Sequence, residues 1–110
     1  MQARTLLVVD DDDAFRNRLA RAMEKRGYDV SAAATVKEAQ QLAQDLKPEF
    51  AVVDLRMPGG SGLDVVQTLR QARKSMRIVI LTGYGNIATA VAAVKVGAVD
   101  YLAKPADADA

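Results

Sequence analysis

The chain contains no cysteine and no histidine among its 110 residues. Without cysteine there is no disulfide and no thiolate chemistry, and a reducing compartment is allowed. Without histidine there is no Ser-His-Asp triad and no histidine-ligated metal site. Any reaction on this chain must therefore use carboxylates, hydroxyls, amines and backbone groups.

Long apolar runs and an excess of one charge are absent as well. Fifteen Lys and Arg residues face fourteen Asp and Glu residues, so no basic surplus points to nucleic acid as a direct partner. No stretch approaches the roughly 18 apolar residues of a membrane span, and the apolar run near the N-terminus is too short for a signal peptide. We expect one domain covering 1–110, located in the cytoplasm and without a membrane partner.

Short apolar runs alternate with amphipathic segments along the whole chain. The pattern predicts strands at about 5–9, 28–33, 50–53, 77–81 and 99–102, and helices at about 13–25, 36–46, 63–73 and 86–97. The strand at 28–33 alternates in polarity and is expected at an edge. Strict alternation with short connections predicts an α/β fold, with a parallel sheet covered on both faces.

Several helix boundaries carry their own signals. Asp13 is predicted to cap the first helix and Gly27 to follow its end, while Thr35 and Glu38 form the spacing of a capping box. The predicted inward faces are Phe15, Leu19, Ala22 and Met23 in the first helix, and Val36, Ala39, Ala43 and Leu46 in the second.

Polar residues follow four of the predicted strands. They are Asp10 and Asp11 after the first, Asp54 after the third, Thr82 after the fourth and Lys104 after the fifth. Taken singly, each has an ordinary explanation as a turn residue, a cap or a surface charge. Together they should meet at one edge of the sheet, because the carboxyl ends of parallel strands lie side by side.

This set of groups suits metal-assisted phosphoryl transfer to a carboxylate. Three neighbouring carboxylates repel one another unless a cation lies between them, and Mg²⁺ prefers oxygen ligands. With no histidine or cysteine in the chain, Asp54 is the candidate nucleophile. Lys104 would contribute a fixed positive charge and Thr82 a hydroxyl donor to a phosphoryl group.

These motifs resemble the receiver domain of two-component response regulators over essentially the whole chain. The residues that carry the resemblance, in the order and spacing of the family, are Val8-Val9-Asp10-Asp11, Asp54-x-x-Met57-Pro58 with Gly62, Leu81-Thr82-Gly83 and Lys104-Pro105. The resemblance implies a flavodoxin-like, doubly wound sheet of five parallel strands in the order 2-1-3-4-5. It also implies a protein that is not an enzyme beyond its own phosphorylation and dephosphorylation.

The resemblance also implies roles for individual residues. Asp54 would accept the phosphoryl group from a sensor histidine kinase, and Asp10 and Asp11 would form the acidic pair. Direct Mg²⁺ ligands would be Asp11, Asp54 and the backbone carbonyl of Arg56. Thr82 and Lys104 would contact the phosphoryl group, Thr82 and Tyr101 would form the switch, and the bond before Pro105 would be cis.

The segments 81–91 and 104–108 resemble, more narrowly, the redox-responsive RegA/PrrA/ActR group of regulators. In that group a helix-turn-helix domain follows the receiver, so DNA would be bound only by a domain outside this chain. Five residues follow Pro105, too few for the fifth helix of a receiver. With that helix missing, one face of the sheet should be partly bare, and we expect self-association.

Two other functions share some of these features. A haloacid-dehalogenase-type phosphatase also combines a strand-end Asp with Mg²⁺, Thr and Lys, but it needs its nucleophile after the first strand and a longer chain. A pseudo-receiver, a non-phosphorylated interaction module, would keep the fold and lose some of the acids or the lysine. All five groups are present here.

Overall fold

The computed structural model describes residues 4–54, 56–57, 60–82 and 100–103. Its elements are β1 (Arg4–Val9), α1 (Asp13–Lys25), β2 (Tyr28–Ala33), α2 (Val36–Leu46), β3 (Phe50–Asp54), β4 (Arg56–Met57), β5 (Gly60–Ser61), α3 (Gly62–Ala72), β6 (Arg77–Thr82) and β7 (Asp100–Ala103). The predicted strands and the first three helices are present, with bounds that differ by at most one residue at either end. The helix predicted at 86–97 lies outside the described residues.

Five parallel strands form one sheet in the order β2-β1-β3-β6-β7. Counting only these five along the chain gives the predicted order 2-1-3-4-5, and β2 lies at an edge as its alternating polarity indicated. The order reverses between β1 and β3, which are adjacent. In sheets of this kind, that reversal opens a crevice at the carboxyl ends of the two strands.

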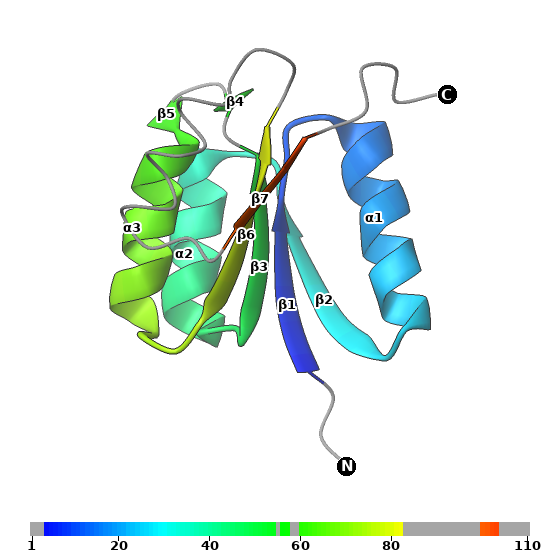
Figure 1. Cartoon of the computed structure of the whole chain (residues 1–110), viewed down its shortest axis with the longest axis horizontal. Helices are drawn as coiled ribbons and strands as arrows, with labels where there is room; N and C mark the ends of the chain where they lie inside the picture. Colours follow the sequence, from blue (N-terminus) through cyan, green and yellow to red (C-terminus); the bar gives the residue numbers. More distant parts are fainter. Residues whose placement is uncertain (1–3, 55, 58–59, 83–99, 104–110) are drawn as a thin grey trace.

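Helices cover the sheet on both sides, with α2 and α3 on one side and α1 on the other (Figure 1). The α2/α3 side holds the main core, because alternate residues of β1, β3 and β6 meet both helices there. Its largest fully buried members are Leu7, Leu69, Met76, Ile78 and Ile80. These strand positions carry apolar side chains, mostly leucine and β-branched residues, so the interface between the sheet and helices α2 and α3 excludes water.

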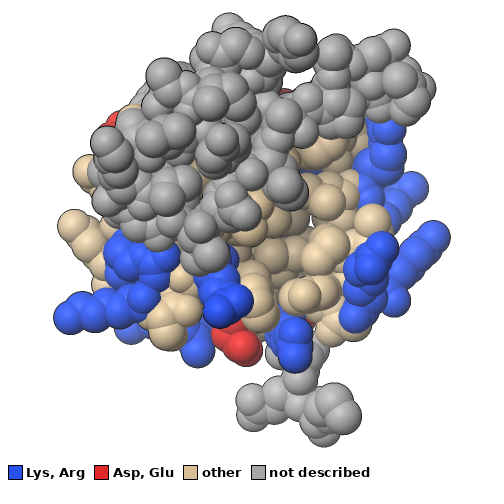
Figure 2. Space-filling view, in the orientation of Figure 1, with Lys and Arg blue, Asp and Glu red and all other residues tan. Residues whose placement is uncertain are grey.

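The α1 side is packed less completely. Leu6 and Val8 are buried, but Val52 and Val79 are only half-buried, and α1 has no buried residue. A groove of about 270 Å³ lies on this face, and Met23, Val52 and Val79 are among its lining residues. Figure 2 shows tan atoms flanked by Lys and Arg side chains in the lower half of the molecule. The predicted bare sheet face depends on residues after Pro105, which lie outside the described residues, so it stays a prediction.

Three local predictions needed correction. Asp12, rather than Asp13, caps α1, since its side chain accepts a hydrogen bond from the backbone N–H of Phe15. Ala22 was predicted to face inward and is exposed. Leu46 was also predicted to face inward and is 48% exposed, because it occupies the last residue of α2, beyond the buried turns.

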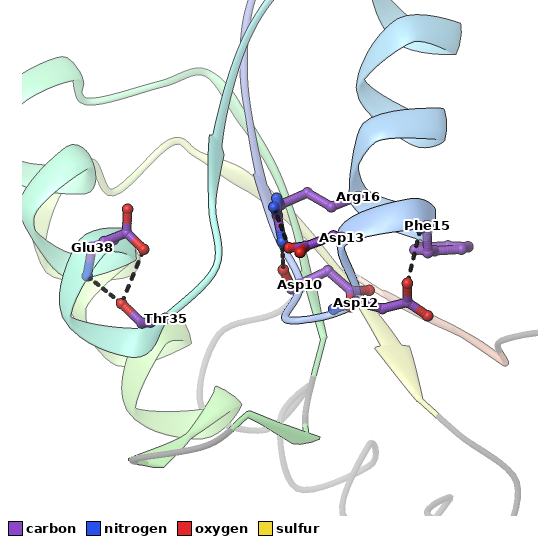
Figure 3. Close-up of polar contacts among 7 residues, drawn as sticks. All are labelled: Asp10, Asp12, Asp13, Phe15, Arg16, Thr35 and Glu38. Carbon is purple, nitrogen blue, oxygen red and sulfur yellow. Dashed lines mark hydrogen bonds and ion pairs between the residues drawn. The ribbon is translucent and has the colours of Figure 1, made fainter.

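Two other boundaries formed as predicted. Gly27 follows the end of α1 with φ of 97°, a left-handed conformation that glycine adopts without steric cost. At the start of α2, the Thr35 hydroxyl accepts a hydrogen bond from the Glu38 backbone N–H at 3.1 Å and contacts the Glu38 carboxylate at 3.3 Å (Figure 3). These caps fix where each helix leaves its strand.

Candidate functional site

Three carboxylates meet where β1 and β3 end. Val9 pairs with Val53 in the sheet, so the next residues, Asp10 and Asp54, leave adjacent strands at the same level. One carboxylate oxygen each of Asp10, Asp11 and Asp54 lies within 4.8 Å of the others. Asp10 is 0% exposed and Asp54 is 4% exposed, while Asp11 is exposed. The structure therefore brings together the three acids that the strand ends predicted.

The backbone after β1 is held by hydrogen bonds on several sides. The Asp10 N–H donates to the Ala33 carbonyl at 3.1 Å, which continues the pairing with β2 past the last strand residue. The Asp12 N–H then donates to Oδ1 of Asp10 at 2.9 Å, closing a tight side-chain turn. These contacts set the direction in which the acidic pair faces the end of β3.

Arg16 is a member of this site that sequence reasoning missed. Its Nη1 donates to the Asp10 carbonyl at 2.9 Å, and its Nη2 pairs with Oδ1 of Asp13 at 2.6 Å (Figure 3). The i,i+3 spacing of Asp13 and Arg16 could have indicated the ion pair. The contact with a main-chain carbonyl leaves no signal in a sequence.

The positions of Thr82 and Tyr101 follow from the strands that contain them. Thr82 is the last residue of β6 and pairs with Ala103, one step beyond the pairing of Asp54 with Leu81. Tyr101 lies in β7, the strand next to β6. The side chains of both residues lie outside the described part of the structure, so their roles stay predictions.

The structure describes the backbone of Arg56 but not Lys104. Arg56 lies in β4, which pairs with β5 in a small antiparallel sheet that the sequence did not predict. Its proposed carbonyl contact with a metal stays a prediction. Lys104, and Pro105 with its predicted cis bond, lie outside the described residues.

The donor set of this site fits a hard divalent cation. It offers only oxygen atoms, and two of the three carboxylates are withdrawn from water. Buried like charges at this spacing destabilise one another unless a cation offsets them. Asp10, Asp11 and Asp54 would hold such an ion, and Mg²⁺ and Ca²⁺ both accept carboxylate oxygens.

The chain belongs to the response regulator receiver domain family, whose family model matches residues 6–110. This finding confirms the resemblance drawn from the motifs at the strand ends. Within the described ranges, no helix combines the length and apolar character needed to cross a bilayer.

Among its relatives is the photosynthetic apparatus regulatory protein RegA of Cereibacter sphaeroides, 61% identical over 96% of this chain and 58% of that protein. The acid tolerance regulatory protein ActR of Rhizobium meliloti is 59% identical over 96% of this chain and 55% of its own length. The narrower resemblance to the RegA/PrrA/ActR group is thereby confirmed. The chain spans somewhat more than half the length of these relatives.

Solved structures show the same fold. A response regulator from Burkholderia pseudomallei, described with a phosphorylated aspartic acid, a calcium ion and citrate, superposes with a TM-score of 0.87 at 47% identity, covering 96% of this chain and 62% of that one. NtrX from Brucella abortus superposes with a TM-score of 0.87 at 30% identity, covering 98% of this chain and 25% of that one.

Proposed function

We propose that this chain is a phosphoacceptor receiver in which Asp54 takes a phosphoryl group from a sensor histidine kinase with the help of Mg²⁺. The observation that carries the proposal is the convergence of Asp10, Asp11 and Asp54 at the ends of β1 and β3. The Burkholderia pseudomallei relative, described with a phosphorylated aspartic acid and a calcium ion, supports the same chemistry.

In the transfer, a carboxylate oxygen of Asp54 attacks phosphorus while the phosphorus–nitrogen bond of a phosphohistidine breaks. The histidine nitrogen leaves with the bonding electron pair, and an acyl phosphate remains on Asp54. A bound divalent cation would offset the charge of the carboxylates and of the phosphoryl oxygens. Asp54 stands at the end of a central strand, so the scaffold holds its carboxylate in place before the donor arrives. Catalysis by the chain is limited to forming and hydrolysing this acyl phosphate.

The conformational switch would run through Thr82 and Tyr101. The two residues lie on neighbouring strands, with Thr82 beside Ala103 and Tyr101 beside Ile80. After phosphorylation, the Thr82 hydroxyl would turn toward the phosphoryl oxygens, and Tyr101 would fill the space it leaves. A phosphoryl group can shift this equilibrium only by its differential affinity for the two states, so the active state exists as a minor state beforehand.

The output would be control of transcription by a helix-turn-helix domain outside this chain. RegA and ActR, which are named as regulatory proteins, are nearly twice as long as the part that matches. The near balance of charge on this chain agrees with DNA being bound elsewhere. A receiver that is phosphorylated by a kinase domain and acts on DNA through a separate output domain would work in the cytoplasm.

A titration with Mg²⁺ and beryllofluoride tests the proposal, because this anion complex occupies the place of a phosphoryl group on a carboxylate. Amide resonances at the ends of β1, β3 and β6 should shift together in the wild type and stay unchanged in Asp54→Asn. Acetyl phosphate should label the wild type and not the variant. Labelling that persists in Asp54→Asn would move the nucleophile elsewhere, and no response in the wild type would favour a pseudo-receiver. Turnover of a generic phosphate ester would instead favour a phosphatase.

We also propose that the chain self-associates through the α1 side of the sheet. That side has the groove lined by Met23, Val52 and Val79, whereas the core side chains between the sheet and helices α2 and α3 are buried. Sedimentation velocity without phosphate should show a dimer whose population grows with concentration. A monomer at high concentration would refute this assignment and leave the phosphoacceptor proposal untouched.

A further inference from the structure

We infer that Arg16 is a positioning residue that clamps the loop between β1 and α1 and so sets the affinity of the acidic site for a divalent cation. The part of this inference that concerns Mg²⁺ rests on the proposed function. The clamp itself is a property of the apo chain and can be measured without a metal.

The clamp has two arms. One guanidinium nitrogen of Arg16 donates to the Asp10 carbonyl at 2.9 Å, and the other contacts the Asp13 carboxylate at 2.6 Å. A guanidinium is planar, so one side chain fixes both contacts at once. The Arg16 side chain is 15% exposed although Asp13 is 80% exposed, so the arginine lies back against the loop rather than in solvent (Figure 3).

Asp10 is thereby held through three of its own atoms. Its N–H donates to the Ala33 carbonyl, its carbonyl accepts from Arg16, and its Oδ1 accepts from the Asp12 N–H. Arg16 thus closes a ring of contacts that runs from the end of β1 to the first turns of α1. Asp11, whose carboxylate belongs to the acidic cluster, lies inside this ring.

A clamp and a bare positive charge would change cation affinity in opposite directions. A bare arginine near the site would repel Mg²⁺, so removing it would tighten binding. Here the Asp13 carboxylate pairs with the guanidinium, so much of that charge is compensated within the clamp. The geometric effect should therefore dominate, and losing the two-armed contact should weaken binding.

Two substitutions separate these effects. Arg16→Lys keeps the charge and loses the planar two-armed contact, whereas Arg16→Gln loses both. Arg21→Gln removes the same charge from an exposed position of α1 and serves as the charge control. Thr5→Val removes the hydrogen bond between the Thr5 hydroxyl and the Glu49 N–H near the opposite end of β1, and serves as the stability control.

Isothermal titration of the apo proteins with Mg²⁺ should show a dissociation constant roughly tenfold higher for both Arg16 variants, which is the usual effect of removing a residue that orients metal ligands. The two controls should stay within about twofold of the wild type. In the absence of metal, NMR-detected exchange of the Asp12 amide with water should be faster in both Arg16 variants and unchanged in the controls.

Tighter Mg²⁺ binding by Arg16→Gln would overturn the inference in favour of a charge effect. Unchanged binding and unchanged Asp12 exchange in the Arg16 variants would show that the clamp orders nothing. If the wild type binds no Mg²⁺, the proposed function fails, and the exchange of the Asp12 amide alone then decides whether the clamp exists.

Discussion

Replacing Asp54 with asparagine should stabilise the metal-free protein. Asp10 and Asp54 are both buried, and their carboxylate oxygens lie within 4.8 Å of each other. With an effective dielectric constant of about 20, two unit charges at that separation repel by about 3.5 kcal/mol. The substitution keeps the shape of the side chain and removes this repulsion.

The measured gain should be smaller than the pairwise energy, because the wild-type side chains can turn apart and water can screen them. We expect a gain of about 1–2 kcal/mol, which corresponds to a rise in Tm of about 5–10 °C for a domain of this size. Mg²⁺, by contrast, should stabilise the wild type more than the Asp54→Asn variant. At ten times its dissociation constant, a ligand of the folded state stabilises it by about 1.4 kcal/mol. That stabilisation should be present in the wild type and nearly lost in Asp54→Asn.

Thermal unfolding followed by circular dichroism, with and without Mg²⁺ at matched ionic strength, measures both effects. Asp29→Asn is a suitable control, because it removes one negative charge from an exposed position on the edge strand β2. Without metal, Asp54→Asn should unfold at a higher temperature than the wild type and the control. An Asp54→Asn protein that is less stable than the wild type without metal, or equally stabilised by Mg²⁺, would refute this account of the site.

Four further substitutions test the core, with an exposed control, a helix cap and the switch. Leu69→Ala, which empties a fully buried position of α3, should lower the free energy of unfolding by about 2–5 kcal/mol in urea denaturation, whereas Leu46→Ala at a 48% exposed position should cost less than about 1 kcal/mol. Thr35→Ala should cost about 1 kcal/mol in the same assay, because the Glu38 N–H loses its acceptor. Thr82→Ala should still be labelled by acetyl phosphate but should respond weakly, and undiminished phosphorylation-induced dimerisation in sedimentation experiments would argue against the proposed switch.

The alternation of apolar runs with amphipathic segments was sufficient to predict the five strands of the parallel sheet and the three described helices. Strand order could not be derived from that pattern, because every parallel arrangement of the strands uses the same apolar runs. The predicted order 2-1-3-4-5 came from the family resemblance. The cap of α1 was misplaced because four consecutive aspartates, 10–13, offer several equivalent starts for the helix. The β4–β5 pair has two residues in each strand, too few for any periodic signal.

The candidate site was predictable where it depends on strand ends and unpredictable where it depends on the path of a loop. Asp10 and Asp54 come together because β1 and β3 are adjacent and parallel, which is a property of the sheet. The position of Arg16 depends on how the chain turns between β1 and α1, since its partner there is a main-chain carbonyl. A contact of this kind depends on the three-dimensional path of the loop and has no counterpart in the residue pattern.

The unequal packing of the two sides of the sheet has a consequence for how the molecule opens. Helices α2 and α3 pack buried side chains against the sheet, whereas α1 contributes none, so α1 is the least buried of the three described helices. Breathing motions of the native state should therefore begin with α1, while β1, β3 and β6 stay joined to α2 and α3. Since Arg16 belongs to α1, each such excursion would also release the acidic loop, which links local unfolding of one helix to the loss of a bound cation.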